Sequence, residues 1–574
     1  MGVFLFLKMK YTPGFLLLFL SWLQPLHLSP WVSWHSEVLA FAATVWFFFV
    51  AMYEQSRSPI KCLSIPYIAA VPLTIVLLVI VQYSQGMIAF GGDAYIYSIY
   101  LFTCTFALIA GFNWPSQAEA LQSRLTVSFP VHQMAMAVLA GGVTSVLIAV
   151  IQCLDVWKWS EWIVRMPTVG RPGGNLGQPN HFATLLVMSM ASLVYLFKWQ
   201  KVSWSFCLFL LLTLGFGVAM SGSRAGLLSV SVLSIWWLAK SDTAELKVRA
   251  YVFAGVSLSF LFLVLIWPTL INKIYLDGAA DAMVRTDSGL RFLLWPQMLD
   301  AALEKPLFGW GWGEVSKAHN SIAHHYKSSL PFTYAHNLFL DSAIGMGIPF
   351  TVLFTGFGAF YIFNRIRRSQ SKSTWYFIAM CIPLAVHSMF EFPYAYAYFL
   401  FPVMLLLGAL EAKVGLSRVI NIRLHLAVLA SAAVILSMSL AVKEYINLEE
   451  DFQVARFEAL RVGSRPAGYE SPHTTLLTQL DAVVKCARLV ISPGMQQEDI
   501  DLLGKTAKRF PWSALQYRYA LALGLNNNPS EASRQLQIIK AMNDERSYAR
   551  IWDNWHNLAS EKYPQLRFVE QPPR

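Results

Sequence analysis

The sequence predicts an all-α polytopic integral membrane protein with about 13 transmembrane helices, a long outside loop and a helical C-terminal outside domain. Hydrophobic residues make up 56% of the 574 residues and charged residues only 13%, whereas soluble domains carry about 25% charged residues. Apolar runs of about 20 residues, the length that crosses a bilayer as a helix, recur along most of the chain. The net charge of +11 is not spread evenly but follows the segments that connect these runs.

The connecting charges test the positions of the predicted spans. The spans lie near residues 12–28, 37–53, 67–84, 93–112, 134–154, 181–198, 204–220, 225–239, 250–268, 336–363, 374–391, 395–411 and 424–443. If the N-terminus is cytoplasmic, the inside loops hold Lys8, Lys10, Arg57, Lys61, Arg124, Lys198, Lys201, Lys240, Lys247, Arg249, Arg365, Arg367, Arg368, Lys372, Lys413, Arg418 and Arg423. The short outside loops 29–36, 85–92 and 392–394 contain no Lys or Arg, as the positive-inside rule predicts. An odd number of spans then places the tail from Lys443 outside.

Four predicted parts follow from this layout. They are N-terminal transmembrane helices at 1–268, a large outside loop with an interfacial helix at 269–335, C-terminal transmembrane helices at 336–443 and a soluble helical domain at 444–574. In the last part, Ala514–Met542 has helical periodicity on both sides of an Asn-Asn-Asn-Pro turn, which predicts two amphipathic helices. Because the basic residues follow the topology, we expect them to contact membrane lipid, and we predict no nucleic-acid partner.

Two outside segments carry basic residues against the topological bias. The segment 155–180 contains Lys158, Arg165 and Arg171, and the tight turn Ser221–Arg224 ends in an arginine. Binding of an anionic headgroup would explain both, and the planar guanidinium of Arg224 suits a phosphate. The alternative is an arginine that anchors a helix end by reaching the headgroup region.

A glycine-rich segment, Gly173–His181, directly precedes a predicted span. Its glycines allow backbone N–H groups to approach a ligand closely, and Gln178, Asn180 and His181 offer hydrogen-bonding groups at the membrane surface. This pattern favours substrate binding. The alternative is a Gly/Pro turn followed by a helix that Asn180 caps.

The loop 269–335 contains the predicted interfacial helix. Pro296 is expected to open a helical turn, and Arg291 and Trp295, four residues apart, would share one side. The residues of the predicted apolar face are Leu293, Met298, Leu299 and Ala302.

The second half of this loop combines aromatic and histidine residues. The glycine/aromatic turn Lys305–Gly313 is expected to place Trp side chains at headgroup depth. Three histidines follow, His319, His324 and His325, and with His336 they suggest a metal site. No nearby carboxylate cluster or HExxH spacing supports that suggestion, so we predict no metal and no cofactor.

The pair His336 and Asn337 lies where the loop meets an apolar run. Imidazole accepts a proton near neutral pH, which makes His336 a candidate general base, and Asn337 could orient it or cap the helix. A structural histidine at a helix start is the alternative. Near the end of a later span, His387 and Glu391 are four residues apart, which predicts that one helical face carries both, as functional groups or as a buried structural pair.

Five motifs occur in order and carry a resemblance to a known family. They are GNLGQPNHFATLL at 174–186, SGSRAGLL at 221–228, LRFLLWPQMLDAALEKPLFGWGWG at 290–313, AHNLFLDSAIGMGI at 335–348 and HSMFEFPYAYAYFLFP at 387–402. The set resembles the bacterial protein O-oligosaccharyltransferases of the PglL type, which are grouped with the O-antigen ligases and Wzy polymerases.

The resemblance implies a GT-C-like glycosyltransferase of the bacterial inner membrane with its active face and C-terminal domain in the periplasm. It implies inverting, metal-independent transfer of a glycan from undecaprenyl pyrophosphate to Ser or Thr of pilin or another exported protein. The family's essential histidine falls on His336, its arginines on Arg224 and Arg291, and its glutamine on Gln178. Relatives can carry Tyr where this chain has Phe392, which puts a hydroxyl role there in doubt; the neighbouring hydroxyls include that of Tyr396.

Other functions stay open at this point. Within the same chemistry, the glycan could be ligated to lipid A-core or polymerised; the large outside tail favours a protein acceptor. A transporter of lipid-linked glycan would be expected to show internal repeats, and none is visible in the sequence. A non-catalytic binding module is the remaining class. His336 could act as the general base or contact the phosphate.

Overall fold

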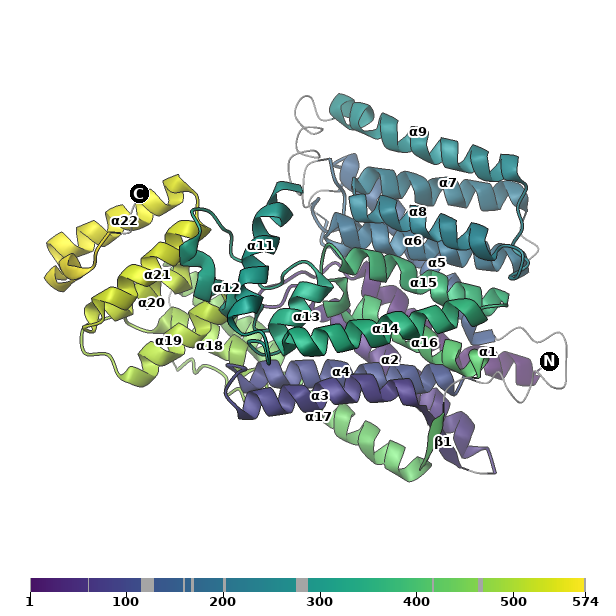
Figure 1. Cartoon of the computed structure of the whole chain (residues 1–574), viewed down its shortest axis with the longest axis horizontal. Helices are drawn as coiled ribbons and strands as arrows, with labels where there is room; N and C mark the ends of the chain where they lie inside the picture. Colours follow the sequence, from purple (N-terminus) through teal and green to yellow (C-terminus); the bar gives the residue numbers. More distant parts are fainter. Residues whose placement is uncertain are drawn as a thin grey trace. The chain divides into compact units, whose positions relative to one another are not determined.

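The computed structural model describes residues 2–59, 61–114, 129–157, 160–166, 170–199, 203–274, 288–415, 418–462 and 468–571 (Figure 1). The basic residues Arg124, Lys158 and Lys201 and the side chain of Lys8 lie outside the described residues. Within the described ranges, nine helices are long and apolar enough to cross a membrane. The prediction of an all-α multi-pass membrane protein is therefore confirmed, while the number of 13 spans stays a prediction.

The chain divides into two compact units. The first comprises Met1–Ile75, Ile99–Asp287 and Gly358–Ser437, and the second comprises Val76–Ser98, Ser288–Phe357 and Met438–Arg574. Elements wholly in the first are α1 (Gly2–Leu23), α2 (Trp34–Ser56), β1 (Cys62–Pro66), η1 (Tyr67–Ala69), α5 (Phe129–Cys153), η2 (Gly174–Leu176), α6 (Pro179–Trp199), α7 (Trp204–Ser221), α8 (Arg224–Lys240), α9 (Ala250–Ile274), α15 (Lys372–Ser388), η4 (Pro393–Ala395), α16 (Ala397–Val414) and β2 (Val419–Arg423). Elements wholly in the second are α11 (Ser288–Glu304), α12 (Val315–Ile322), η3 (Ala323–His325), α13 (Leu338–Met346), α18 (Thr478–Arg488), α19 (Gln497–Arg509), α20 (Ser513–Leu525), α21 (Pro529–Met542), α22 (Glu545–Glu561) and η5 (Pro564–Phe568). The division passes through α3 (Ala70–Ser84), α4 (Gly91–Phe112), α14 (Ile348–Arg368) and α17 (Leu424–Ala459).

Helix α6 is the centre of the first unit. Its apolar window is 89% buried, because it packs against α5, α7, α8 and α15 (Figure 1). Small residues allow close contact between other helices of this unit. A Cβ on Gly111 of α4 would lie 1.8 Å from the carbonyl oxygen of Leu405 in α16. Close backbone contact at small residues is a common way to pack helices in a membrane. The motif at the start of α6 is therefore part of a well-packed core.

A two-stranded sheet in the first unit was not anticipated. Strands β1 and β2 pair antiparallel, with Cys62 opposite Arg423 and Pro66 opposite Val419. Both strands lie in segments that the topology places in inside loops, where the charge pattern carries no information about pairing. The alternation in Val419–Arg423 is too short to separate from other loop sequence.

The C-terminal helices of the second unit form a core of their own. Buried side chains of α18 to α22 and η5 pack together, including Leu503, Leu523, Leu536 and Trp555. Helices α20 and α21 flank the Asn-Asn-Asn-Pro turn, which confirms the two helices predicted for this segment.

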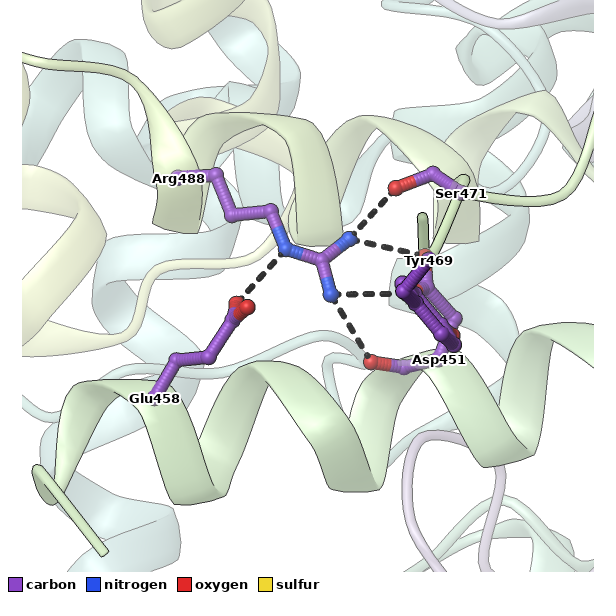
Figure 2. A network of polar contacts seen from close by, with 5 residues as sticks. All are labelled: Asp451, Glu458, Tyr469, Ser471 and Arg488. Atoms are coloured by element: carbon purple, nitrogen blue, oxygen red, sulfur yellow. Dashed lines mark hydrogen bonds and ion pairs between the residues drawn. The ribbon is translucent and has the colours of Figure 1, made fainter. Parts of the chain in front are cut away.

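An arginine joins this core to the charged second half of α17. Arg488, at the end of α18, places Nη2 2.7 Å and Nη1 2.9 Å from the two carboxylate oxygens of Asp451 (Figure 2). Its Nε donates to Glu458 at 2.9 Å, and Tyr469 donates to Asp451 at 2.9 Å. Paired N–H groups meeting one carboxylate fix an angle as well as a distance. The contact therefore sets the orientation of α18 on α17.

Helices α11, α12 and α13 form a second cluster in this unit. Leu294, Met298 and Ala302 of α11 are buried against residues of α12 and α13. The predicted apolar face is thus wrong: Met298 and Ala302 face protein, whereas Leu299 is exposed. Helix α11 is apolar on more than one side, and packing by α12 and α13 decides which side is covered. Pro296 lies inside α11 and does not open it, so that expectation was also wrong.

The predicted single span at 336–363 is two helices. Helix α13 ends at Met346 and α14 begins at Ile348, and Gly347 between them has φ +87°. A positive φ interrupts a right-handed helix and is available to glycine at little cost. The sequence is apolar across this break, so hydropathy alone could not reveal it.

The glycine/aromatic turn supports that break. Trp310 N donates to Ile344 O at 2.7 Å, and Ile348 N donates to Pro306 O at 2.7 Å. Trp310 is buried, and its indole donates to Ala301 O at 2.7 Å. The expectation of a headgroup anchor is wrong for Trp310, which is a core residue that holds α13 at its C-terminal end.

Candidate functional site

The glycine-rich segment before α6 is held as a fixed loop. Gly174 and Gly177 both have positive φ, and Asn175 reaches back to bond Leu23 O at 2.8 Å and Trp162 O at 2.9 Å. Gln152 accepts from Gly174 N at 3.0 Å. The sequence did not single out the side chains of Asn175 and Gln152. An isolated Gln in an apolar run, such as Gln152, carries no local signal.

Gln178 ends this loop and has a distinctive environment. Its side-chain Oε1 is buried and accepts no hydrogen bond from a described residue. Burying an amide oxygen without a donor costs about 1–3 kcal/mol, which a ligand donor would offset. Asn180, two residues later, is buried, and its carbonyl accepts from Thr184 at 3.0 Å.

His181 and His387 come together in the first unit. Their ring centroids are 5.6 Å apart, and His181 Nδ1 lies 3.1 Å from Tyr398 Oη. His387 Nδ1 lies 2.8 Å from the hydroxyl of Thr184. The ring of Tyr396 meets that of His181 edge-on at 4.4 Å. Thr184 and Tyr398 lie within the quoted motifs and were not singled out.

The prediction for Glu391 needs one correction. Helix α15 ends at Ser388, so Glu391 lies in the turn that follows and not on the same helical face as His387. Its N–H still bonds the His387 carbonyl at 2.9 Å, and its side chain is buried. Pro393 begins η4 two residues later, and a proline disfavours helical backbone just before it.

Arg171 and Arg224 flank one turn but differ in exposure. Arg171 is buried, and its Nε donates to Ser221 O at 3.1 Å at the end of α7. Arg224 is exposed at the first position of α8, where Ser223 caps the helix by accepting from Gly226 N at 3.0 Å. Among the described residues Arg224 forms no ion pair with a carboxylate. Arg171 therefore supports the turn, and Arg224 is the guanidinium available to an anion.

His336 has a strained backbone in the second unit. Its φ is +53°, a left-handed conformation that costs a non-glycine residue of order 1–3 kcal/mol and is concentrated at functional sites. Both neighbours are fixed: Ala335 N donates to Asp341 at 2.8 Å, and Asn337 caps α13. The imidazole is partly exposed and meets the ring of Phe332 edge-on at 5.5 Å. The structure thus holds this side chain at the start of α13.

The amide of Asn337 gives the helix cap. Its Oδ1 accepts from Phe339 N at 3.0 Å and Leu340 N at 3.2 Å. Replacing Asn337 with serine, which also caps well, is expected to keep the unfolding temperature within a degree or two, whereas alanine should cost about 1 kcal/mol. Thermal unfolding of the purified variants in detergent measures this. If the transfer rate falls equally in both variants while only alanine destabilises, the amide has a substrate role beyond the cap.

Arg291 lies in the first turns of α11, beside an exposed apolar stripe. Phe292, Leu299 and Leu303 are exposed at helical spacing, which is the pattern of a helix that contacts lipid. The predicted interfacial helix keeps this support with a different set of residues. Arg291 itself is partly buried.

The described histidines of the loop do not form a metal-binding cluster. Over the described residues, no group of three or more His, Cys, Asp or Glu side chains is placed to hold a metal ion. The ring centroids of His324 and His325 lie 4.0 Å apart, with the two ring planes tilted by 48°. His319 is fully buried beside Gln297 and Ser329.

Burial lowers the pKa of His319 from its ordinary value of 6.5 to about 4. The unfolded chain then binds a proton that the folded chain does not, so stability falls as pH drops from about 6.5 towards 4 and levels off below. The difference between the pKa of His319 in the unfolded and in the folded chain corresponds to about 3 kcal/mol of unfolding free energy. We expect the unfolding temperature to fall over this range, and His319→Gln, which cannot titrate, to reduce the fall. If the unfolding temperature falls equally with pH in the wild type and in His319→Gln, this expectation is contradicted.

Comparison with known proteins supports the motif assignments. Three family descriptions match: "Protein glycosylation ligase" at residues 172–197, "O-Antigen ligase" at 208–355 and "Virulence factor membrane-bound polymerase, C-terminal" at 375–556. The chain is 26% identical over 539 residues to the general O-oligosaccharyltransferase of Acinetobacter baylyi, covering 92% of this chain and 91% of that protein. It is 28% identical over 354 residues to the ComP-specific O-oligosaccharyltransferase of the same organism, covering 59% and 61%.

The chain is similar to two bacterial O-oligosaccharyltransferases. The resemblance inferred from the five motifs is confirmed, since each motif lies within one of the three matched ranges. The prediction of an enzyme of the glycosyltransferase class is confirmed with it. Of the residues proposed for catalysis, His336 and Arg291 belong to the second unit and Arg224 to the first.

Proposed function

We propose that the protein transfers an oligosaccharide en bloc from undecaprenyl pyrophosphate to Ser or Thr hydroxyl groups of pilin or other exported proteins. Transfer is proposed to take place at the periplasmic face of the bacterial inner membrane; the charge pattern, with a cytoplasmic N-terminus, predicts the C-terminal domain on that side. The observation that carries the proposal is the match to the general O-oligosaccharyltransferase over 92% of the chain. That share is too large to omit all of α18 to α22, the helices that we propose bind a protein acceptor.

The leaving group decides what chemistry the site must supply. As the glycosidic bond to pyrophosphate breaks, negative charge develops on phosphate oxygens. Arg224 and Arg291 are proposed to stabilise that charge. His336 takes the proton of the attacking hydroxyl, which is otherwise a poor nucleophile. One in-line displacement then inverts the anomeric centre.

Substrate contacts on the donor side are assigned to the first unit. The side-chain Oε1 of Gln178 is buried and accepts no hydrogen bond from a described residue. We propose that it accepts a hydrogen bond from a sugar hydroxyl. The rings of His181 and His387 are buried and that of Tyr396 is partly exposed. A sugar ring is proposed to pack against Tyr396, with His181 and His387 supporting that ring from behind. Glu391 and Asn180 complete this proposed set, and Asn337 and Arg171 act by fixing His336 and the turn before Arg224.

Reconstitution tests the proposal. The full-length protein is placed in liposomes with undecaprenyl-pyrophosphate-linked glycan and a pilin, and the intact mass of the pilin is measured. An increase by one whole glycan is expected, and it should persist with a metal chelator because the arginines supply the positive charge. No mass change with any exported protein acceptor would reject protein glycosylation.

One observation favours a second function. The "O-Antigen ligase" description covers 208–355, the range that holds both arginines and His336. The same chemistry would then join the glycan to lipid A-core or to another glycan. A parallel assay with lipid A-core as acceptor, read by mass of the lipid, separates this from protein glycosylation.

A further inference from the structure

A buried polar cluster lies under the segment that carries His336. Its members are His319 on α12, Gln297 on α11 and Ser329 in the connecting segment, and none exposes more than 4% of its surface. His319 Nε2 lies 2.8 Å from Ser329 Oγ and 3.0 Å from Gln297 Oε1. Ser329 Oγ donates to Gln297 Oε1 at 2.7 Å.

The chemistry of the three side chains determines which of them donates each hydrogen bond. An amide oxygen only accepts, so the hydrogen of His319 lies on Nε2 and points at Gln297 and Ser329. Ser329 accepts from His319 and donates to Gln297. Burial, which keeps the pKa of His319 near 4, holds this imidazole neutral in the donor form. Removing one member takes one hydrogen bond from each of the other two buried groups, which is costly.

The cluster fixes one end of the segment that leads to His336. Gln297 Nε2 donates to Ser328 O at 3.0 Å, and Ser329 N donates to Ala541 O of α21 at 2.6 Å. The segment is therefore bonded at residues 328–329 to α11, α12 and α21.

The other end of the segment is fixed at α13, and an aromatic ring lies between. Phe332 has its ring 6.1 Å from that of His319 and 5.5 Å from that of His336. Ala335 is buried and bonded to Asp341. Any shift at Ser329 thus reaches His336 over a short, packed path.

We propose that His319, Gln297 and Ser329 are positioning residues that hold the segment 328–337, and through it His336, in the geometry needed for glycan transfer. This inference rests on the proposed function. It gives the C-terminal helices a part in catalysis, because α21 supplies one of the bonds that fix the segment.

Matched serines provide the first test. Ser329→Ala removes the buried hydroxyl, whereas Ser328→Ala alters an exposed neighbour and leaves its backbone carbonyl in place. We expect Ser329→Ala to lower kcat about 10- to 100-fold with the KM for lipid-linked glycan unchanged, since misplacement by about 1 Å can cost this much. Ser328→Ala should match the wild type. Equal rates in both variants would overturn the proposal.

His319 provides the second test. His319→Gln keeps a donor near the Nε2 position and should recover most of the rate that His319→Leu loses. In a His336→Asn background, neither change at His319 should lower the residual rate further, because positioning acts only through His336. An additional loss there would show that the cluster acts by general stability, and would contradict the proposal.

Amide hydrogen exchange separates this inference from the proposed function. Exchange at residues 330–337 should be faster in Ser329→Ala than in Ser328→Ala, with exchange in α18 to α22 unchanged. If the wild type transfers glycan to no acceptor, the proposed function fails and the exchange measurement still tests the support of the segment. Unchanged exchange in Ser329→Ala would overturn the inference even if the wild type is active.

Discussion

Replacing His336 with asparagine is expected to lower kcat for glycan transfer by at least about 10²-fold without destabilising the protein. General base catalysis typically contributes about 10²- to 10⁴-fold. Asparagine tolerates the left-handed backbone that His336 adopts at φ +53°, so the fold should be kept. Initial transfer rates and thermal unfolding of the same preparation measure the two effects.

A matched change controls for loss of any loop histidine. His325→Asn alters an exposed side chain in the same loop and should leave both rate and unfolding temperature unchanged. A wild-type rate for His336→Asn would remove the catalytic role altogether. Binding of lipid-linked glycan then separates two mechanisms. If His336 is the base, binding is unchanged and only kcat falls in the variant; if it contacts phosphate, the binding of lipid-linked glycan weakens.

Replacing Arg224 or Arg291 with alanine is expected to cost about 10²- to 10³-fold in kcat, the usual effect of removing one group that stabilises developing charge. Lysine should restore only part of the rate, because a point charge cannot meet two phosphate oxygens as a planar guanidinium does. Arg546→Ala, an exposed arginine on α22, is the control. Transfer assays with excess lipid-linked glycan measure kcat directly.

The two arginines also differ from Arg171 in what their loss should do. Arg171 is buried against Ser221 O, so Arg171→Ala should lower the unfolding temperature as well as the rate. Arg224→Ala should leave the unfolding temperature unchanged because its side chain is exposed. If Arg224→Ala destabilises the protein while the rate per folded molecule stays at the wild-type value, Arg224 anchors a helix end and does not stabilise the leaving group.

The sequence predicted those helices whose periodicity or apolar length can be read from one short stretch of the chain. Helices α20 and α21 follow from periodicity on either side of a turn, and most of the membrane helices follow from the length of their apolar runs. Sequence failed where one apolar surface had several possible partners. On α11, only packing decided that Met298 is covered and Leu299 exposed, and at Gly347 only the backbone revealed a break inside an apolar run.

The same division holds for the candidate site. By itself the sequence supplied the apolar runs, the charge placement and the five motifs in order. The resemblance that these motifs carry implied the class of enzyme and the choice of His336, Arg224 and Arg291. Only the tertiary structure decided that Arg171 is buried while Arg224 is exposed, and that His319 supports the segment bearing His336. Burial and hydrogen bonding join residues far apart in the chain, such as Ser329 and Ala541, and a pairing of that kind leaves no periodic trace in the sequence.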